Sequence, residues 1–283
     1  MKRRRFLQIV AGAALIAQGA RAETWSGQAF GADVRITAPG ALPLADIRAE
    51  IAAIEATFSL YAESELTRLN AAGRGAGSDR LRAVLAVAKR VHDLTRGAFD
   101  PTVQPLWRAL AEGRDPVQPR AAIGLHRVQI GREIVLARGQ ALTLNGIAQG
   151  HAADRVAEIC ARAGLGACLI DMGEFRALGG PFRLGIEDPA AGMVAARMLT
   201  GGAMATSSPA AMAFPGGSHI LGPHGQIPRF STVTVEGASA TLCDAASTAF
   251  VLMEREDIVT AAQRMRLRAV TVVDFEGNFE TLV

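Results

Sequence analysis

The segment 144–150 reads Leu144-Asn145-Gly146-Ile147-Ala148-Gln149-Gly150, a turn of small residues that leads into a helix and then into a strand. The helix is expected from about Ala152 to Ala163, and Gly164 is typical of a helix end. The apolar run Ala167-Cys168-Leu169-Ile170 that follows has the length and composition of a buried strand. This order of turn, helix and strand indicates that helices pack against a sheet.

Helical patterns precede this segment in the chain. Ile47, Ile51, Ile54 and Phe58 recur at spacings of three and four, which places them on one stripe of a helix. A second helix is expected from the cap candidates Ser78 and Asp79 to Gly97, whereas residues 112–120 contain two prolines and several charges and predict a surface loop.

Strand patterns occur near both ends of the chain. Alternation around Phe30–Ile36, the run Thr232–Val235 before a helix starting at Asp244, and a terminal hairpin turning at Glu276-Gly277-Asn278 are each typical of strands. The mixture predicts an α/β or α+β fold with a sheet and packed helices, and no internal repeat interrupts it.

Composition predicts an ordered, globular chain. Of the 283 residues, 49% are hydrophobic and 20% are charged, enough apolar sequence to build a sizeable core. The net charge of +3 includes five cations among residues 1–22, and without them the remainder is near −2. No basic stripe with interleaved aromatic residues is present, so a nucleic-acid partner is not expected.

Residues 1–22 have the features of a secretory leader. A cationic start precedes the apolar run Ile9–Ala17, and the small-residue site Ala20-Arg21-Ala22 predicts cleavage before Glu23. The alternative is a retained membrane anchor, but this run is short for about 30 Å of hydrocarbon, so no stable membrane insertion is expected. The pattern Arg3-Arg4-x-Phe6-Leu7 resembles a twin-arginine signal and predicts export to the periplasm.

The three cysteines show no metal-ligand spacing. Cys160, Cys168 and Cys243 are an odd number and cannot all pair within one chain. We interpret them as buried apolar thiols.

Asp244 and Thr248 are candidate metal ligands. Four residues apart in the expected helix, they would lie one turn apart on the same face. A carboxylate and a hydroxyl oxygen suit Mg²⁺, which prefers oxygen ligands. The alternative is that Asp244 only caps the helix and that Thr248 packs.

Two further segments are candidate binding features. The turn 144–150 allows a close approach of backbone to ligand and directs helix N–H groups at an anion, although an ordinary strand-to-helix connection would look similar. His219, one of five histidines, is a candidate general acid or base, with a structural histidine as the equal alternative.

Taken together, these segments resemble the ApbE-type FAD:protein FMN transferase family. The resemblance extends from about Phe30 to the last strand, and its strength lies in the order of short blocks rather than in any one block. These blocks are Phe58-Ser59-Leu60-Tyr61, residues 64–70, Gly97-Ala98-Phe99-Asp100-Pro101-Thr102-Val103, residues 145–154, Asp171-Met172-Gly173, Ala205-Thr206-Ser207, His219-Ile220-Leu221, and Asp244 with Thr248.

The resemblance implies a fold and a reaction. The fold would be α+β, of the T-fold-like ApbE architecture with sheets packed with helices, over residues 23–283 after the leader 1–22. The reaction would be Mg²⁺-dependent transfer of FMN from FAD to a Thr or Ser hydroxyl of an exported or membrane flavoprotein, with release of AMP. Some family members serve respiratory electron transfer, including nitrous-oxide reduction, which suggests the kind of acceptor without identifying it.

The resemblance also implies roles for individual residues. Asp244 and Thr248, with the backbone carbonyl at Gly146, would hold Mg²⁺, and Tyr61 would stack on the isoalloxazine ring. His219 would handle a proton or stabilise phosphate as the catalytic candidate. The remaining expected FAD contacts are Phe30, Ala98, Phe99, Asp100, Thr143, Gln149 and Leu221.

Several positions depart from the usual family pattern. Thr143 stands where an Asp is common and Gln149 where a Lys or Glu is usual, and Ser247 occupies a position where a second acid can lie near the metal. The other departures are Gly173-Glu174-Phe175, Ser208 and Gly222. They leave two alternatives open. One is a non-catalytic FAD-binding or flavin-delivery protein, and the other is hydrolysis of FAD to FMN and AMP.

Overall fold

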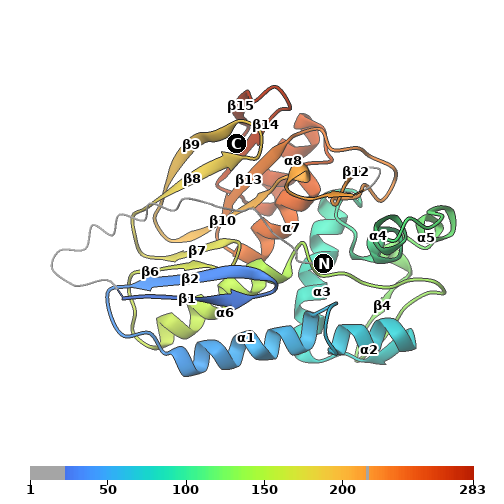
Figure 1. Ribbon diagram of the computed structural model, residues 1–283, viewed down its shortest axis with the longest axis horizontal. Coiled ribbons are helices and arrows are strands. Elements are labelled where there is room, and N and C mark those ends of the chain that lie inside the picture. The colour runs from blue at the N-terminus through green and yellow to red at the C-terminus, as the bar shows by residue number, and fades with distance from the viewer. Residues whose placement is uncertain (1–22, 215–216) are drawn as a thin grey trace.

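The computed structural model describes residues 23–214 and 217–283, so the predicted leader lies outside the described residues. Its central feature is an antiparallel sheet with the strand order β1-β2-β6-β7-β10-β13-β14-β15 (Figure 1). These strands are β1 (Glu23–Ala29), β2 (Ala32–Ala38), β6 (Cys168–Asp171), β7 (Phe175–Leu178), β10 (Gly202–Ser207), β13 (Thr232–Gly237), β14 (Ala269–Val273) and β15 (Phe279–Thr281).

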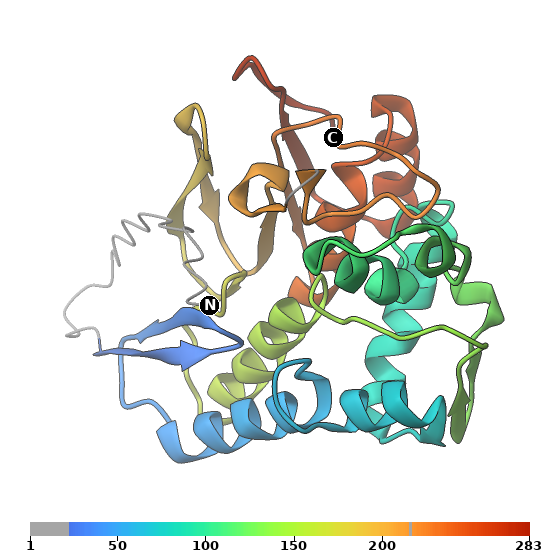
Figure 2. The same ribbon diagram turned by 45° about the vertical axis from the view of Figure 1, so that its right-hand side comes forward.

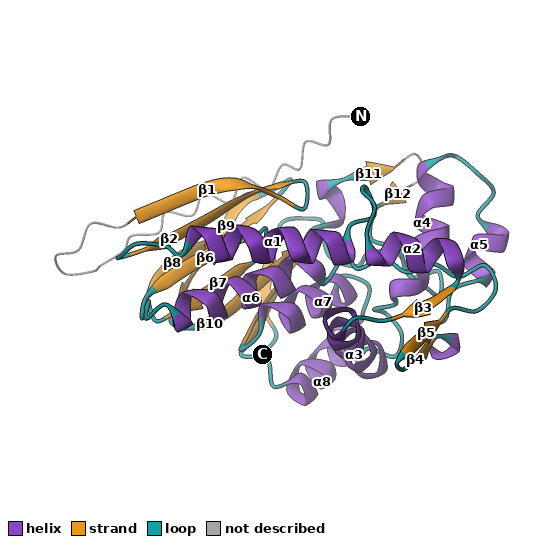
Figure 3. Cartoon of the chain, turned by 90° about the horizontal axis from the view of Figure 1, so that it is seen from below, coloured by secondary structure: helices purple, strands orange, loops and turns teal. Residues whose placement is uncertain are grey.

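Helices α6 (Ala148–Arg162) and α7 (Ala240–Phe250) pack against this sheet and against each other. Helix α1 (Leu44–Phe58) lies along α6, while α3 (Asp79–Leu94) contacts α7 and α8 (Arg255–Met265) (Figures 1 and 3). The helices therefore form a layer beside the sheet, and one hydrophobic core extends through both. This arrangement confirms the predicted α+β class.

The remaining elements extend the molecule beyond the sheet, with α2, α4 and α5 on the side of α3 (Figure 2). They are α2 (Glu65–Ala72), α4 (Gln104–Ala111), α5 (Val117–Ala121), the small sheet of β3 (Arg74–Ala76), β5 (Glu133–Val135) and β4 (Gln129–Ile130), and the hairpins β8 (Phe182–Asp188) with β9 (Gly192–Leu199) and β11 (Ala213–Phe214) with β12 (Gly217–Ser218). No helix in residues 23–214 or 217–283 is long and apolar enough to cross a bilayer.

Several sequence predictions are confirmed. Ile47, Ile51, Ile54 and Phe58 are all buried on α1. Helix α3 begins after Ser78, whose Oγ accepts a hydrogen bond from the Leu81 amide at 3.1 Å. The terminal hairpin is present as β14 and β15, and all three cysteines are free and buried.

Other predicted boundaries are wrong. Phe30 lies in the turn between β1 and β2, at φ 54°, so the second strand begins two residues later. Helix α6 begins at Ala148 rather than Ala152, because Ala148, Gln149 and Gly150, at the end of the predicted turn, are themselves helical. The predicted loop 112–120 includes most of the short helix α5. The two prolines of this segment do not prevent the helix, because Pro116 is its N-cap and Pro119 lies in its first turn.

Helix α7 also begins earlier than predicted, at Ala240. Its N-cap is Ser239, whose side chain accepts a hydrogen bond from the Leu242 amide at 3.3 Å. Asp244 therefore lies in the second turn, and the alternative that it caps the helix is wrong.

Candidate active site

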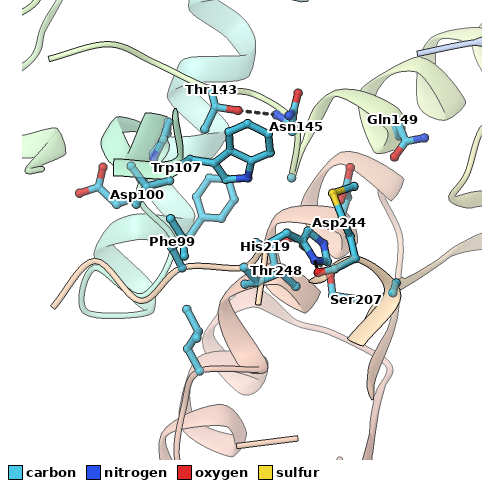
Figure 4. Close-up of a pocket in the computed structure, with 18 of the residues that line it drawn as sticks. Phe99, Asp100, Trp107, Thr143, Asn145, Gln149, Ser207, His219, Asp244 and Thr248 are labelled. Atoms are coloured by element: carbon cyan, nitrogen blue, oxygen red, sulfur yellow. Dashed lines mark hydrogen bonds between the residues drawn. The ribbon is translucent and has the colours of Figure 1, made fainter. Parts of the chain in front are cut away.

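A cleft opens between α7, the end of β10, the turn before α6 and the loops around residues 98–103 and 219–221 (Figure 4). Its empty volume, including the open mouth, is about 1230 Å³. Eleven of the twelve predicted site residues line it: Tyr61, Ala98, Phe99, Asp100, Thr143, Gly146, Gln149, His219, Leu221, Asp244 and Thr248. Residues far apart in the sequence thus meet at one place.

Asp244 and Thr248 lie on the face of α7 that forms one wall of the cleft. Asp244 is only 4% exposed, and its Oδ2 accepts a hydrogen bond from the Gly150 amide at 2.9 Å. This bond ties the carboxylate to the first turn of α6. The predicted pairing of a carboxylate and a hydroxyl on successive turns of one helix is therefore present.

Further oxygen atoms surround Thr248. Its Oγ1 lies 3.3 Å from Ser207 Oγ, which in turn lies 2.8 Å from Ser247 Oγ. Gly146 approaches so closely that a Cβ there would lie 2.8 Å from Thr248 Oγ1. The wall therefore combines one carboxylate, hydroxyls and nearby backbone.

This donor set suits a hard cation. Within the described part of the chain, no three His, Cys, Asp or Glu side chains group as a metal site. A cation at this wall would instead use the Asp244 carboxylate with hydroxyl, backbone and ligand oxygens. Mg²⁺ accepts such a mixture because it commonly keeps only one or two protein carboxylates and completes its shell with water and phosphate.

Aromatic rings form another part of the cleft. Tyr61 is 60% exposed at the rim, and its hydroxyl accepts a hydrogen bond from Asn145 Nδ2 at 3.3 Å. Phe99 and Trp107 also line the cleft (Figure 4). Flat rings of this kind suit a planar aromatic ligand. Trp107 was not predicted from the sequence, because it lies outside the blocks that resemble the family.

The loop that carries Phe99 is held by Asp100. The Asp100 carboxylate accepts hydrogen bonds from the Thr102 amide at 2.8 Å, the Thr102 hydroxyl at 2.6 Å and the Leu125 amide at 3.0 Å. These bonds commit both carboxylate oxygens to the loop. Asp100 therefore shapes the wall of the cleft, and its contact with the ligand stays a prediction.

His219 lies at the cleft with a defined ring orientation. Its Nδ1 lies 3.0 Å from the Met212 carbonyl oxygen. Because a carbonyl only accepts, Nδ1 carries the proton in this contact, and Nε2 holds the lone pair of the neutral ring. Both sequence interpretations of His219 are compatible with this contact.

The chain matches the ApbE family model over residues 30–271. The chain belongs to the ApbE family. Among solved structures, the chain is similar to the flavin transferase ApbE from Vibrio cholerae, with 25% identity, a TM-score of 0.80, and coverage of 93% of this chain and 96% of that one.

Two other solved structures are similar to this ApbE-family chain. The flavinyl transferase ApbE of Pseudomonas stutzeri, in its apo form, has 25% identity, a TM-score of 0.80, and coverage of 92% and 94% of the two chains. The ApbE protein of Thermotoga maritima, at 23% identity, a TM-score of 0.82 and coverage of 92% and 96%, supports the fold alone. No curated protein matches this chain by sequence. Family and neighbours together support flavin transfer to proteins as the class of activity.

Four departures from the family pattern line the cleft of this ApbE-family chain, namely Thr143, Gln149, Glu174 and Ser208. The Thr143 hydroxyl accepts a hydrogen bond from the Asn145 amide at 3.2 Å and so shapes the turn before α6. Gln149 is buried beside Gly173, where a Cβ would lie 2.4 Å from Gln149 Nε2. Gly173 therefore leaves room for this amide.

The third departure is Glu174, which sequence reasoning did not select as a site residue. It lines the cleft, is 6% exposed, and accepts a hydrogen bond from the Thr206 amide at 2.9 Å. The buried acid therefore joins the β6–β7 turn to β10 at the cleft wall. Only its position next to the Asp171-Met172-Gly173 block could have drawn attention to it.

Phe30 is the one predicted site residue outside the main cleft. It lines a smaller hollow with Glu55 and Phe58, and this hollow shares Tyr61, Asn145 and Gln149 with the cleft. The Phe30 amide donates to Glu55 Oε1 at 2.9 Å, which holds the β1–β2 turn near the rim.

Asp154, quoted in the sequence only as part of a block, fixes the start of α7. Its carboxylate accepts hydrogen bonds from the Ala240 amide at 3.0 Å, the Thr241 amide at 2.9 Å and the Ser239 hydroxyl at 2.7 Å, and pairs with Arg176 at 3.1 Å. A negative charge at a helix N-terminus is stabilising. Helix α6 therefore positions the helix that carries Asp244 and Thr248.

Proposed function

We propose that this chain transfers FMN from FAD to a Thr or Ser hydroxyl of a partner protein, with Mg²⁺ as cofactor and AMP as the second product. The observation that carries the proposal is the cleft itself, in which the oxygen atoms of Asp244 and Thr248 and the exposed ring of Tyr61 line a single space. A flavin dinucleotide has both a planar ring system and a charged pyrophosphate, and these surfaces suit the two parts.

The residues at the α7 wall fit a magnesium ion. Asp244, Thr248 and the Gly146 carbonyl would hold it, and when bound it neutralises charge on the pyrophosphate. The Gly150 amide keeps the Asp244 carboxylate in place, at 2.9 Å. In this mechanism the protein mainly positions groups and balances charge, as is general for phosphoryl transfer.

The chemical step joins the acceptor oxygen to the FMN phosphorus and breaks the bond between that phosphorus and the oxygen bridging to AMP. The acceptor hydroxyl loses its proton and the AMP phosphate becomes the leaving group. His219 is our candidate to take this proton at Nε2, because its Nδ1 proton is directed to the Met212 carbonyl oxygen at 3.0 Å. Tyr61 would orient the flavin ring, and Phe99 and Trp107 would exclude water from the cleft.

We further propose that the protein works after export. The support is the leader-like composition of residues 1–22, with the twin-arginine-like pattern Arg3-Arg4-x-Phe6-Leu7. The acceptor would then be a periplasmic or membrane flavoprotein, with a protein of respiratory electron transfer as the expected class.

The test is a transfer assay with the mature protein, FAD, MgCl₂ and a periplasmic flavoprotein that carries an acceptor threonine. Covalent flavin fluorescence on a denaturing gel and equimolar AMP are expected, and both should disappear with chelator and in Asp244→Asn. The control variant is Asp46→Asn, which removes an exposed carboxylate from α1.

Each alternative gives a different result. Bound FAD that is unchanged in Asp244→Asn, with no transfer by the wild-type protein, would indicate a non-catalytic flavin-binding protein. AMP released at the same rate with and without acceptor would indicate FAD hydrolysis. Either result would refute the transferase proposal.

A further inference from the structure

Three hydroxyl groups form a continuous chain along the α7 wall of the cleft. Thr248 Oγ1 lies 3.3 Å from Ser207 Oγ, and Ser207 Oγ lies 2.8 Å from Ser247 Oγ. The chain ends at the Asp244 backbone carbonyl, to which the Ser247 hydroxyl donates at 3.0 Å. Ser247 is fully buried, whereas Ser207 and Thr248 line the cleft.

The carbonyl at the end of this chain sets the direction of every hydrogen bond in it. A carbonyl oxygen only accepts, and each hydroxyl has one proton to donate. Because Ser247 donates to the carbonyl, it must accept from Ser207. Ser207 has then used its proton, so it must accept from Thr248.

This direction determines what Thr248 can offer to a ligand. Its proton is directed along the wall toward Ser207, and the remaining lone pairs of Oγ1 are available to a positively charged ligand. If the direction were reversed, Thr248 would present its proton and would suit a phosphate oxygen instead. The chain of hydroxyls therefore selects between two kinds of ligand.

We propose that Ser207 and Ser247 are positioning residues that hold the Thr248 hydroxyl as an oxygen donor for a divalent cation. This inference rests on the proposed function, in which Asp244 and Thr248 hold Mg²⁺. It assigns a role to Ser247, an uncharged residue at a position where the family resemblance allows a second acid near the metal. At this position the side chain would act on the metal through Ser207 and Thr248 and would not contact it.

The experiment compares Ser207→Thr with Ser207→Val in the FAD-saturated protein without acceptor. The two replacements have nearly the same shape, but only threonine keeps the hydroxyl, and both suit a strand. Binding of MnCl₂, as a paramagnetic probe for Mg²⁺, is measured by the electron paramagnetic resonance signal of the free ion. Ser247→Ala is the second test variant, and Ser231→Ala is the control, because it removes a buried serine hydroxyl outside the cleft.

We expect Ser207→Val and Ser247→Ala to bind Mn²⁺ about fivefold more weakly than the wild type, the effect of one net hydrogen bond. Ser207→Thr and Ser231→Ala should bind as the wild type does. Equal affinities for Ser207→Thr and Ser207→Val would overturn the inference. The inference would also be overturned if Ser207→Val and Ser247→Ala lost FAD affinity in EDTA while their Mn²⁺ affinity stayed unchanged. That pattern would indicate that the hydrogen bonds of the hydroxyl chain run in the reverse direction.

The same titration separates this inference from the proposed function. Mn²⁺ binding that is lost in Asp244→Ala but unchanged in both serine variants would overturn the hydroxyl chain and leave the metal site in place. Mn²⁺ binding that is the same in the wild type and Asp244→Ala would overturn both.

Discussion

Replacing Gly150 by alanine should force α6 and α7 apart, because the two helices touch at this glycine. A Cβ at position 150 would lie 2.2 Å from the Ala240 carbonyl oxygen and 2.8 Å from Asp244 Cβ. The closer atom belongs to the backbone of α7 and cannot rotate away. The helices would have to separate by about 1 Å to restore an ordinary contact.

The size of the effect follows from two contributions. Overpacking of a well-packed interior typically costs about 1–3 kcal/mol. Separation also weakens the 2.9 Å hydrogen bond from the Gly150 amide to the Asp244 carboxylate, and hydrogen bonds to charged groups contribute about 1.5–3 kcal/mol. For a domain of this size a loss of roughly 4 kcal/mol lowers the melting temperature by about 10 °C.

Thermal unfolding followed by circular dichroism measures this change. Gly166→Ala is the matched control, because a Cβ there meets no atom within 4 Å. The control should melt at or slightly above the wild-type temperature. If Gly150→Ala melted together with Gly166→Ala, the helices would have room at this crossing and the reasoning would be wrong.

Three further variants test the cleft and its surroundings. Tyr61→Ala should weaken FAD binding about tenfold in a calorimetric titration with little change in melting temperature, because the ring is exposed and would stack on the flavin; unchanged affinity would exclude stacking. Gly146→Ala would place a Cβ 2.8 Å from Thr248 Oγ1 and should weaken Mn²⁺ binding, and wild-type binding would show that the turn can move. His151 has a pKa lowered to about 4, first by burial and then by Arg80 and Arg155, so below its ordinary pKa of 6.5 the unfolded chain takes up a proton that the folded chain does not. Stability should therefore fall between pH 6.5 and pH 4, by on the order of 3 kcal/mol, and urea unfolding of His151→Leu should show a smaller fall.

The sequence predicted the long helices well because their apolar spacing depends only on neighbouring residues. The stripe of Ile47, Ile51 and Ile54 and the Ser78 cap are local signals of this kind. Boundaries failed where tertiary contacts decide them. Helix α7 starts at Ala240 because Asp154, distant in sequence, accepts hydrogen bonds from its first amides. The spacing of apolar residues along the chain does not indicate such a distant partner.

In the candidate site too, the sequence predicted what depends on neighbouring residues and did not predict what depends on tertiary contacts. The spacing of Asp244 and Thr248 predicted that they share a face of one helix, and both line the cleft. Ser207 and Glu174 were not predicted as site residues, because they reach the cleft from β10 and from the β6–β7 turn through contacts with Thr248 and Thr206. The predicted flavin contacts came from the family resemblance, since propensity alone does not bring Tyr61 and Asn145 together across 84 positions.

The contacts between α6 and α7 explain why a site of so few charged groups can be ordered before a ligand binds. Asp154 holds the N-terminus of α7, and one turn earlier on α6 the Gly150 amide holds the Asp244 carboxylate. Two attachment points on α6 fix both the position of α7 and its rotation about its own axis. Because Thr248 is one turn further along α7, its hydroxyl is placed by the same contacts. Binding of a ligand to Asp244 and Thr248 would therefore cost the protein little conformational entropy.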